Sequence, residues 1–286
     1  MKIGITSSYY TAAHGFEEGL RQLRADGYEC IDYSGFVDTE TPRFACSDAE
    51  FDAVVRKERN FIESLGLETS QTHGPWRWPS QDATVEDRRE RFEKMSRAIR
   101  GTALLGCRNF VIHPIMPWGR FDADARITYE INLDFMSRLC RAAEKYEVTV
   151  CLENMPMRHQ SLVTPEHCLR LVREVGAKNF KICLDTGHCT MHDVNPGDAV
   201  RMLGCDMLAA LHVHDNDGEK DRHWYPYRGV IDWADFGAAL REIGFAGTLS
   251  LESGVIPGRE SELYDLARRL TGIVAGNDKG GVCRGG

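Results

Sequence analysis

The sequence lacks the features that mark membrane-spanning or disulfide-bonded proteins. None of its apolar runs approaches the ~20 residues that a membrane span requires, and the opening MKIGITSS does not have the pattern of a secretory leader. No CxxC pair occurs among the ten cysteines, and Cys151 and Cys183 lie in apolar runs, where a free cysteine acts as a small hydrophobic residue. We therefore expect a cytoplasmic protein with free thiols rather than a disulfide framework or a thiolate zinc site.

The chain also lacks an excess of positive charge and any internal linker. Lys and Arg number 35 against 43 Asp and Glu, so the net charge is −8, which disfavours a broad nucleic-acid-binding surface. No low-complexity tract divides the 286 residues. We expect one domain over residues 1–275, followed by a glycine-rich and disordered tail over 276–286.

The sequence does contain a regular alternation of short apolar runs and amphipathic segments. Strands are expected at 2–6, 30–33, 67–73, 109–113, 149–153, 180–185, 208–214 and 248–252. The segments between them have helical spacing, and some open with capping signals, such as Ser47 with Glu50 or Thr164 before Pro165. Eight strands alternating with eight helices predict an α/β fold, a single (β/α)8 TIM barrel.

Each expected strand from the third to the eighth ends in a residue that can bind a metal ion. These residues are His73, His113, Glu153, Asp185, His212 and Glu252. In a (β/α)8 barrel the carboxyl ends of the strands form the face that carries the active site. Side chains that only packed the barrel would be apolar at these places, so the repeated pattern predicts a metal-centred site.

The segment 211–229, LHVHDNDGEKDRHWYPYRG, carries further polar residues of the same kind. It places His214 two residues after His212 and continues to Asp221 and His223. Imidazoles and carboxylates at this density are typical of metal sites. We therefore count His214, Asp221 and His223 as possible additional metal ligands.

Five short motifs resemble those of the xylose isomerase-like barrels and occur in the same order along the chain. They are LEN at 152–154, DTGH at 185–188, HVHDN at 212–216, DRH at 221–223 with a following glycine, and LES at 251–253. That superfamily includes sugar phosphate isomerases and epimerases, ketose 3-epimerases, inosose dehydratases, hydroxypyruvate isomerases and endonuclease IV. The resemblance spans nearly the whole chain and specifies the superfamily more than the substrate.

The resemblance implies a ligand set. In such epimerases a Glu, an Asp, a His and a second Glu hold one divalent ion, and these carry over here to Glu153, Asp185, His212 and Glu252. The same two glutamates would form the acid/base pair, and His188 of the DTGH motif would contact the substrate and take part in catalysis. Oxygen-rich ligation with one imidazole favours Mn²⁺, with Mg²⁺, Co²⁺ or Zn²⁺ as alternatives.

These residues predict a metal-dependent sugar isomerase or epimerase. Removal of a proton next to a carbonyl gives an enediolate that a divalent cation stabilises, and Glu153 and Glu252 could supply base and acid. The expected partner is a small sugar or polyol rather than a nucleic acid or a membrane, and a homo-oligomer is possible. Further substrate contacts are expected from His73, His113, His188, Arg222, His223, Trp76 and Trp118.

Two other functions remain open from the sequence. A lyase or dehydratase could use the same site to expel a leaving group from the next carbon, as inosose dehydratases do, or to cleave a C-glycoside. A nuclease similar to endonuclease IV would hold three zinc ions, and His73, His113, His188, Asp221 and His223 could be carried over to the additional ligands. The acidic composition and a dissimilar N-terminal region argue against the nuclease.

Overall fold

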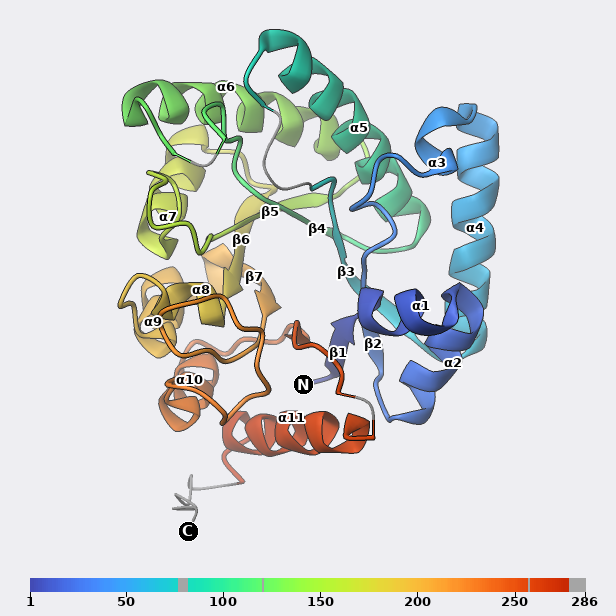
Figure 1. Cartoon of the computed structure of the whole chain (residues 1–286), viewed down its shortest axis with the longest axis vertical. Helices are drawn as coiled ribbons and strands as arrows, with labels where there is room; N and C mark the ends of the chain where they lie inside the picture. The colour runs from blue at the N-terminus through green and yellow to red at the C-terminus, as the bar shows by residue number, and fades with distance from the viewer. Residues whose placement is uncertain (77–81, 120, 257, 278–286) are drawn as a thin grey trace.

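The eight expected strands form one parallel sheet that closes into a barrel. The computed structural model of the chain describes residues 1–76, 82–119, 121–256 and 258–277. The strand order is β7-β6-β5-β4-β3-β2-β1-β8, and a parallel bridge between Val213 and Leu251 joins the two ends of the sheet. Figure 1 shows the helices as a ring around the strands. The predicted (β/α)8 barrel is confirmed.

The strands agree with their expected bounds to within two residues. They are β1 (Ile3–Thr6), β2 (Cys30–Tyr33), β3 (Glu68–His73), β4 (Asn109–Ile112), β5 (Thr149–Glu153), β6 (Phe180–Asp185), β7 (Leu208–His212) and β8 (Leu249–Leu251). The long helices are α2 (Phe16–Ala25), α4 (Asp48–Ser64), α5 (Val85–Leu104), α6 (Ala125–Glu144), α7 (Pro165–Val175), α9 (Pro196–Met207), α10 (Trp233–Glu242) and α11 (Glu260–Val274).

Three short helices that the sequence pattern did not predict follow β1, β2 and β6. They are α1 (Ser8–His14), α3 (Pro42–Ala45) and α8 (Thr186–Thr190). Helices of one or two turns are too short to show an apolar period, so this omission has a simple physical reason. The predicted starts of two helices are confirmed. Ser47 and Glu50 form a capping box on α4, and Thr164 caps α7 with Pro165 as its first residue.

The described part of the chain also shows the state of the cysteines and the character of the helices. Its nine cysteines are unpaired. Within the described ranges, no helix combines the length and apolar character that crossing a bilayer would take. Most of the expected disordered tail, residues 278–286, lies outside the described residues, so the boundary at 275 stays a prediction.

Candidate metal centre and active site

Side chains alternate between the two faces of a strand, and this alternation places the candidate ligands on the inside of the barrel mouth. Val111, Cys151, Cys183 and Ala210 lie on four neighbouring strands and pack together as one small buried cluster. Since side chains two residues apart on a strand point the same way, the next inward positions are His113, Glu153, Asp185 and His212. The same step leads from Gln71 to His73 and from Ser250 to Glu252. Small inner residues thus form the floor on which the polar cluster sits.

Four of these groups meet closely enough to hold one ion. Glu153, Asp185, His212 and Glu252 each offer a ligand atom, and these atoms all lie within 4.8 Å of one another. His212 Nδ1 is 2.9 Å from Glu153 Oε1 and 3.2 Å from Glu252 Oε2. Three carboxylates and one imidazole are a donor set suited to a hard divalent cation. The residues present therefore fit the metal that the sequence predicts.

Asp32, at the inner face of β2, orients the histidine of this set. Its Oδ2 lies 2.9 Å from His212 Nε2 and accepts a 3.0 Å hydrogen bond from Gln71 Nε2. A carboxylate on the far nitrogen fixes the tautomer and leaves Nδ1 facing the other ligands. The sequence reading missed Asp32. The available signal was a charged residue inside the apolar run CIDY, two positions after the inward-facing Cys30.

His73 and His113 surround Glu153 on its other side. His113 Nε2 is 3.0 Å from Glu153 Oε2 and 3.1 Å from His73 Nε2. Burial lowers the pKa of His113 to about 4, although Glu153 acts in the opposite direction. These three side chains make a second group whose atoms could hold an ion.

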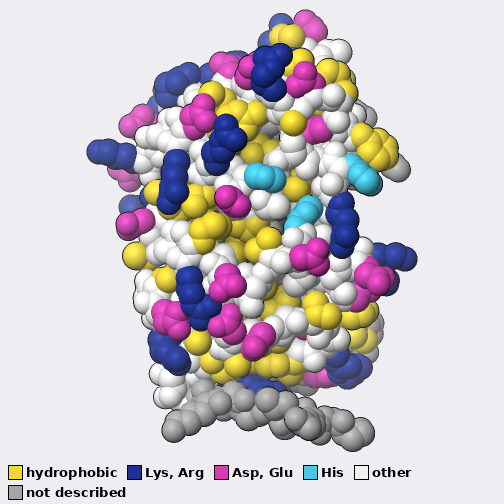
Figure 2. Space-filling model, turned by 90° about the vertical axis from the view of Figure 1, so that its left-hand side faces the viewer, with side chains coloured by type: hydrophobic (Ala, Val, Ile, Leu, Met, Phe, Trp, Pro, Cys, Tyr) yellow, Lys and Arg dark blue, Asp and Glu magenta, His cyan; other side chains and the backbone are white. Residues whose placement is uncertain are grey.

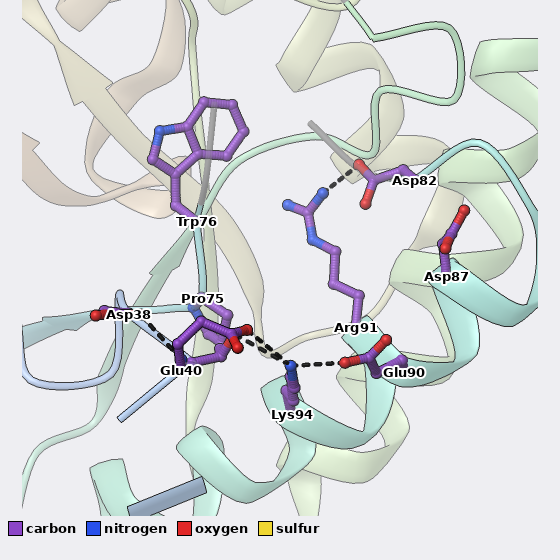
Figure 3. A pocket seen from close by; sticks show the side chains of 10 residues that line it. Asp38, Glu40, Pro75, Trp76, Asp82, Asp87, Glu90, Arg91 and Lys94 are labelled. Atoms are coloured by element: carbon purple, nitrogen blue, oxygen red, sulfur yellow. Dashed lines mark hydrogen bonds and ion pairs between the residues drawn. The ribbon is translucent and has the colours of Figure 1, made fainter. Parts of the chain in front are cut away.

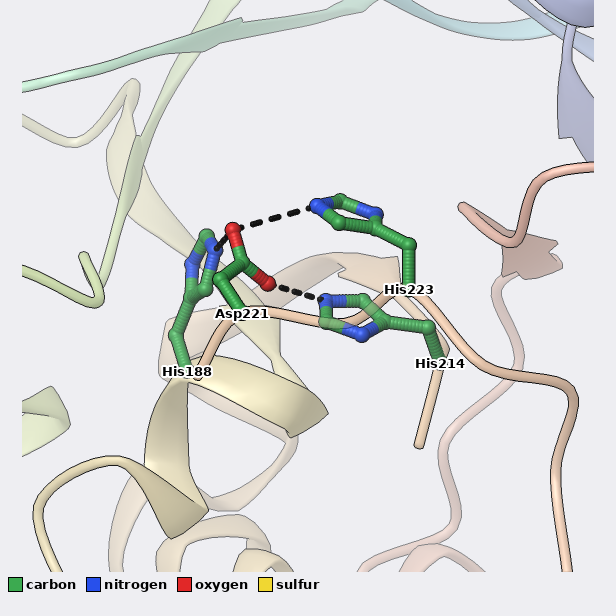
Figure 4. Close-up of side chains that lie close together, drawn as sticks. All are labelled: His188, His214, Asp221 and His223. Carbon is green, nitrogen blue, oxygen red and sulfur yellow. Dashed lines mark hydrogen bonds and ion pairs between the residues drawn. The ribbon is translucent and has the colours of Figure 1, made fainter. Parts of the chain in front are cut away.

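A third group lies around Asp221 and is drawn in Figure 4. The Asp221 carboxylate lies between His188 and His223, with Oδ2 at 3.3 Å and 3.2 Å from their Nε2 atoms. His214 Nε2 is 3.0 Å from Asp185 Oδ2, and the His214 ring stacks on His223 with centroids 4.1 Å apart. The candidate additional ligands His214, Asp221 and His223 are therefore brought together beside the first group.

In this third group, the carboxylates favour the positively charged forms of the histidines. Burial opposes a positive charge on His188, but the Asp185 and Asp221 carboxylates more than offset it and raise the pKa of His188 to about 10. Burial likewise opposes charge on His223, and the hydrogen bond to Asp221 raises its pKa to about 9. Asp185 also caps α8, because its Oδ1 accepts a 2.6 Å hydrogen bond from the His188 backbone N–H. This contact places His188 beside the first group.

Asp215 fixes the loop that supplies Asp221 and His223. Its carboxylate accepts hydrogen bonds of 2.9 Å from Trp233 Nε1 and 2.9 Å from the Gly229 backbone N–H. It is fully buried, so these donors compensate for its lost hydration. Although its neighbours in sequence belong to the site, Asp215 serves as the structural anchor of this loop.

A cavity of about 430 Å³ opens above these groups. It is lined by His73, Trp76, His113, Glu153, His188, Asp221, His223 and Glu252, among others. Two of the predicted substrate contacts lie elsewhere. Trp118 is 43% exposed and is not among the described lining residues. The guanidinium of Arg222 pairs with Asp217 at 2.8 Å and lines a neighbouring pocket, which it shares with His223.

The comparisons with known proteins agree with this fold. The sequence pattern of the xylose isomerase-like TIM barrel family matches residues 20–270. The chain belongs to this family. The solved structure of a D-tagatose 3-epimerase-like protein superposes with a TM-score of 0.79 at 22% identity, covering 96% of this chain and 99% of that one. The IOLI protein with a bound zinc atom superposes with a TM-score of 0.75 at 17% identity, covering 97% and 99%. At these identities the superpositions establish the shared barrel fold.

Sequence comparison shows several relatives of this family member. D-psicose 3-epimerase of Agrobacterium fabrum is 26% identical over 267 residues, which are 90% of this chain and 86% of that protein. D-psicose 3-epimerase of Enterocloster bolteae is 34% identical over 43% of this chain, and an uncharacterized protein of Methanocaldococcus jannaschii is 31% identical over 61% of it. The alignments span only 39% and 62% of those two proteins.

Asp32 offers a test of how the histidine ligand is oriented. Replacing Asp32 by Asn removes the negative charge behind His212, so we expect metal affinity to fall by about 10- to 100-fold while the barrel stays folded. A competition titration against a metallochromic chelator measures the affinity. The control is Asp217→Asn, which removes a carboxylate that pairs with Arg222 outside the cavity lining. Unchanged affinity in Asp32→Asn would show that His212 does not depend on this contact.

Protons and metal should compete for His212. Burial opposes a positive charge there, but the neighbouring groups, among them Cys183, Glu153, Glu252 and Asp32, raise the pKa of His212 well above its ordinary value. The metal-free histidine is therefore protonated near neutral pH, and a bound ion must displace the proton from Nδ1. Metal affinity should therefore rise as the pH is raised from about 6 to about 8, across neutrality. Calorimetry in two buffers of different ionisation enthalpy should show proton release, and a pH-independent affinity without release would contradict this.

Proposed function

We propose that the chain is a divalent-metal-dependent sugar isomerase or epimerase that moves a proton on a carbon next to a carbonyl. The observation that carries the proposal is that Glu153 and Glu252, two members of the four-residue metal group, both open onto the same cavity. The relatives named D-psicose 3-epimerase support a sugar as the substrate. The solved IOLI structure with zinc supports a metal in a barrel of this kind.

Glu153, Asp185, His212 and Glu252 would hold the ion, and we favour Mn²⁺ because three carboxylates outnumber one imidazole. When bound, a divalent ion at this place stabilises the negative charge that develops on the substrate oxygens after proton removal. Asp32 holds His212 in the orientation that the set needs. His188 lines the cavity beside the two glutamates and would orient a substrate oxygen through hydrogen bonding.

The two glutamates reach the cavity from different parts of the barrel rim. Glu153 ends β5 and Glu252 follows β8, and strands β6 and β7 lie between them around the ring. A carboxylate on one side of the substrate can remove a proton and return it to the neighbouring carbon, which is isomerisation. Epimerisation needs a second acid on the opposite side, and the other glutamate of this pair would supply it. The same first step followed by loss of a substituent would give the lyase reaction.

The proton transfer can be tested by solvent exchange. Glu153→Gln and Glu252→Gln should each lower deuterium incorporation into a keto sugar or keto glycoside substrate by at least ~100-fold, because an amide cannot take up the proton. Nuclear magnetic resonance measures the exchange, and metal content is determined on the same samples. Glu262→Gln, a change in a surface ion pair with Arg228, is the matched control. Full exchange in both cavity variants would place the base elsewhere.

A second candidate, the nuclease, is kept because the three ligand groups adjoin one another. His73 and His113 share Glu153 with the first group, and His188 and His214 contact Asp185. Against it stands the charge of the molecule. On the face shown in Figure 2, Lys and Arg side chains are interspersed with Asp and Glu side chains rather than gathered into a basic surface. Phosphate backbones are bound mainly through such surfaces.

Metal stoichiometry separates these two candidates. We expect elemental analysis of the protein after dialysis to find about one divalent ion per chain, as one enolising site requires, with no cleavage of duplex DNA that contains an abasic site. Three tightly held zinc ions together with incision of that DNA would overturn the isomerase proposal in favour of the nuclease.

A further inference from the structure

The cavity at the barrel mouth has two chemically different sides. One side presents His188, Asp221, His223 and Glu252. The other side carries a group of apolar side chains, which we call the apolar wall: Val37, Trp76, Met155, Pro156 and Met157, with Asp38 at its edge next to Val37. The wall comes from the segments after β2, β3 and β5. A ligand in this cavity therefore meets ionisable groups on one side and hydrocarbon, thioether and indole groups on the other.

The apolar wall is a packed structure. Met155 is 2% exposed and forms a buried cluster with Met116 and Val163, against which Trp76 and Met157 pack. The backbone N–H of Met155 donates to Val163 at 2.8 Å, and that of Trp76 donates to the Val37 carbonyl at 3.1 Å. These two amides are therefore already engaged within the protein. The wall therefore offers a ligand mainly van der Waals contact with apolar side chains.

This division restricts the substrate. A sugar hydroxyl pressed against methionine, proline and valine side chains would lose its hydrogen bonds to water without replacing them, which is unfavourable. A free sugar or polyol carries hydroxyl groups along most of its length. A sugar with an apolar substituent can instead direct its hydroxyls to His188, Asp221 and Glu252 and its substituent to the apolar wall.

The neighbouring pocket on the Asp38 side of the cavity does not suit an apolar group. It shares Asp38 and Trp76 with the cavity and is otherwise lined largely by charged residues. Lys94 pairs with Glu90 at 2.6 Å, and Arg91 pairs with Asp82. Both ion pairs are drawn as dashed lines in Figure 3. Placing an apolar group there would bury these ion pairs without compensation. Between this pocket and the apolar wall, the substituent is better placed on the Met155–Met157 side of Trp76.

We propose that the substrate is a sugar bearing an aryl group, an aryl glycoside, rather than a free ketose. An aromatic ring is favoured because indole and thioether groups both make good contacts with aromatic rings. The reaction assigned to this site rests on the proposed function, whereas the binding preference rests on the cavity alone. In a glycoside the anomeric carbon is an acetal, so the carbonyl that activates the neighbouring proton lies at another ring carbon. Oxidation of a ring hydroxyl is the class of reaction that must supply such a substrate.

Binding of matched glycosides tests the proposal without turnover. The metal-loaded protein is titrated calorimetrically with phenyl and methyl glycosides of glucose, galactose and xylose in both anomeric forms. In at least one pair we expect the phenyl member to bind about tenfold more tightly, a difference of 1.4 kcal/mol. Equal affinities in every pair, or no binding by any phenyl member, would overturn the proposal.

Two methionine variants locate the preference. Met157→Gln keeps an unbranched side chain of similar length but adds a polar amide, and it should reduce the phenyl preference to less than about threefold with metal content unchanged. Met202→Gln makes the same change at a methionine on α9 that is 40% exposed, and it should leave the preference intact. A phenyl preference that survives Met157→Gln would contradict the assignment to the apolar wall.

The outcomes also separate this inference from the proposed function. A phenyl preference that depends on Met157, without proton exchange on any keto sugar or keto glycoside, would refute the isomerase chemistry and retain the aryl subsite. Proton exchange on a free ketose without a phenyl preference would retain the chemistry and refute the aryl subsite.

Discussion

The mutual repulsion of three carboxylates, two of them buried, is the constraint on which this barrel mouth depends. Glu153 and Asp185 are almost fully buried, and Glu252 is 21% exposed. Two like charges 4 Å apart cost about 4 kcal/mol at the effective dielectric constant of ~20 near a protein surface. Such a cluster is tolerable when cations sit among the carboxylates. His212 provides one charge in the metal-free protein, and a divalent ion would provide two.

The rest of the mouth follows from that requirement. The strand register places Asp185 opposite His212 and Asp32 opposite Gln71, so the ligands and the group behind His212 are set by backbone pairing. Asp215 anchors the loop that carries the third group. The site is thus held by the paired strands of the barrel at its base and by a buried hydrogen-bonded carboxylate at its rim.

Much of this could be predicted from the sequence, because strands buried on both faces are apolar runs that end where polar residues begin. His73, Glu153 and Asp185 stand at those ends, and the period of two brings them inward. What sequence could not supply depends on contacts between distant segments. Asp32 acts through His212, 180 residues away. Arg222 and Trp118 are the right residue types near the right strands, yet they are not among the described residues that line the cavity. The apolar wall is assembled from three separate loops.

The central claim is that one ion lies among Glu153, Asp185, His212 and Glu252. Anomalous diffraction from crystals of the Mn²⁺-loaded protein, recorded on both sides of the manganese absorption edge, tests it most directly. The account predicts a single strong peak within bonding distance of those four side chains, at roughly 2.0–2.3 Å. Peaks only among His73 and His113, or only among His188, Asp221 and His223, would contradict it.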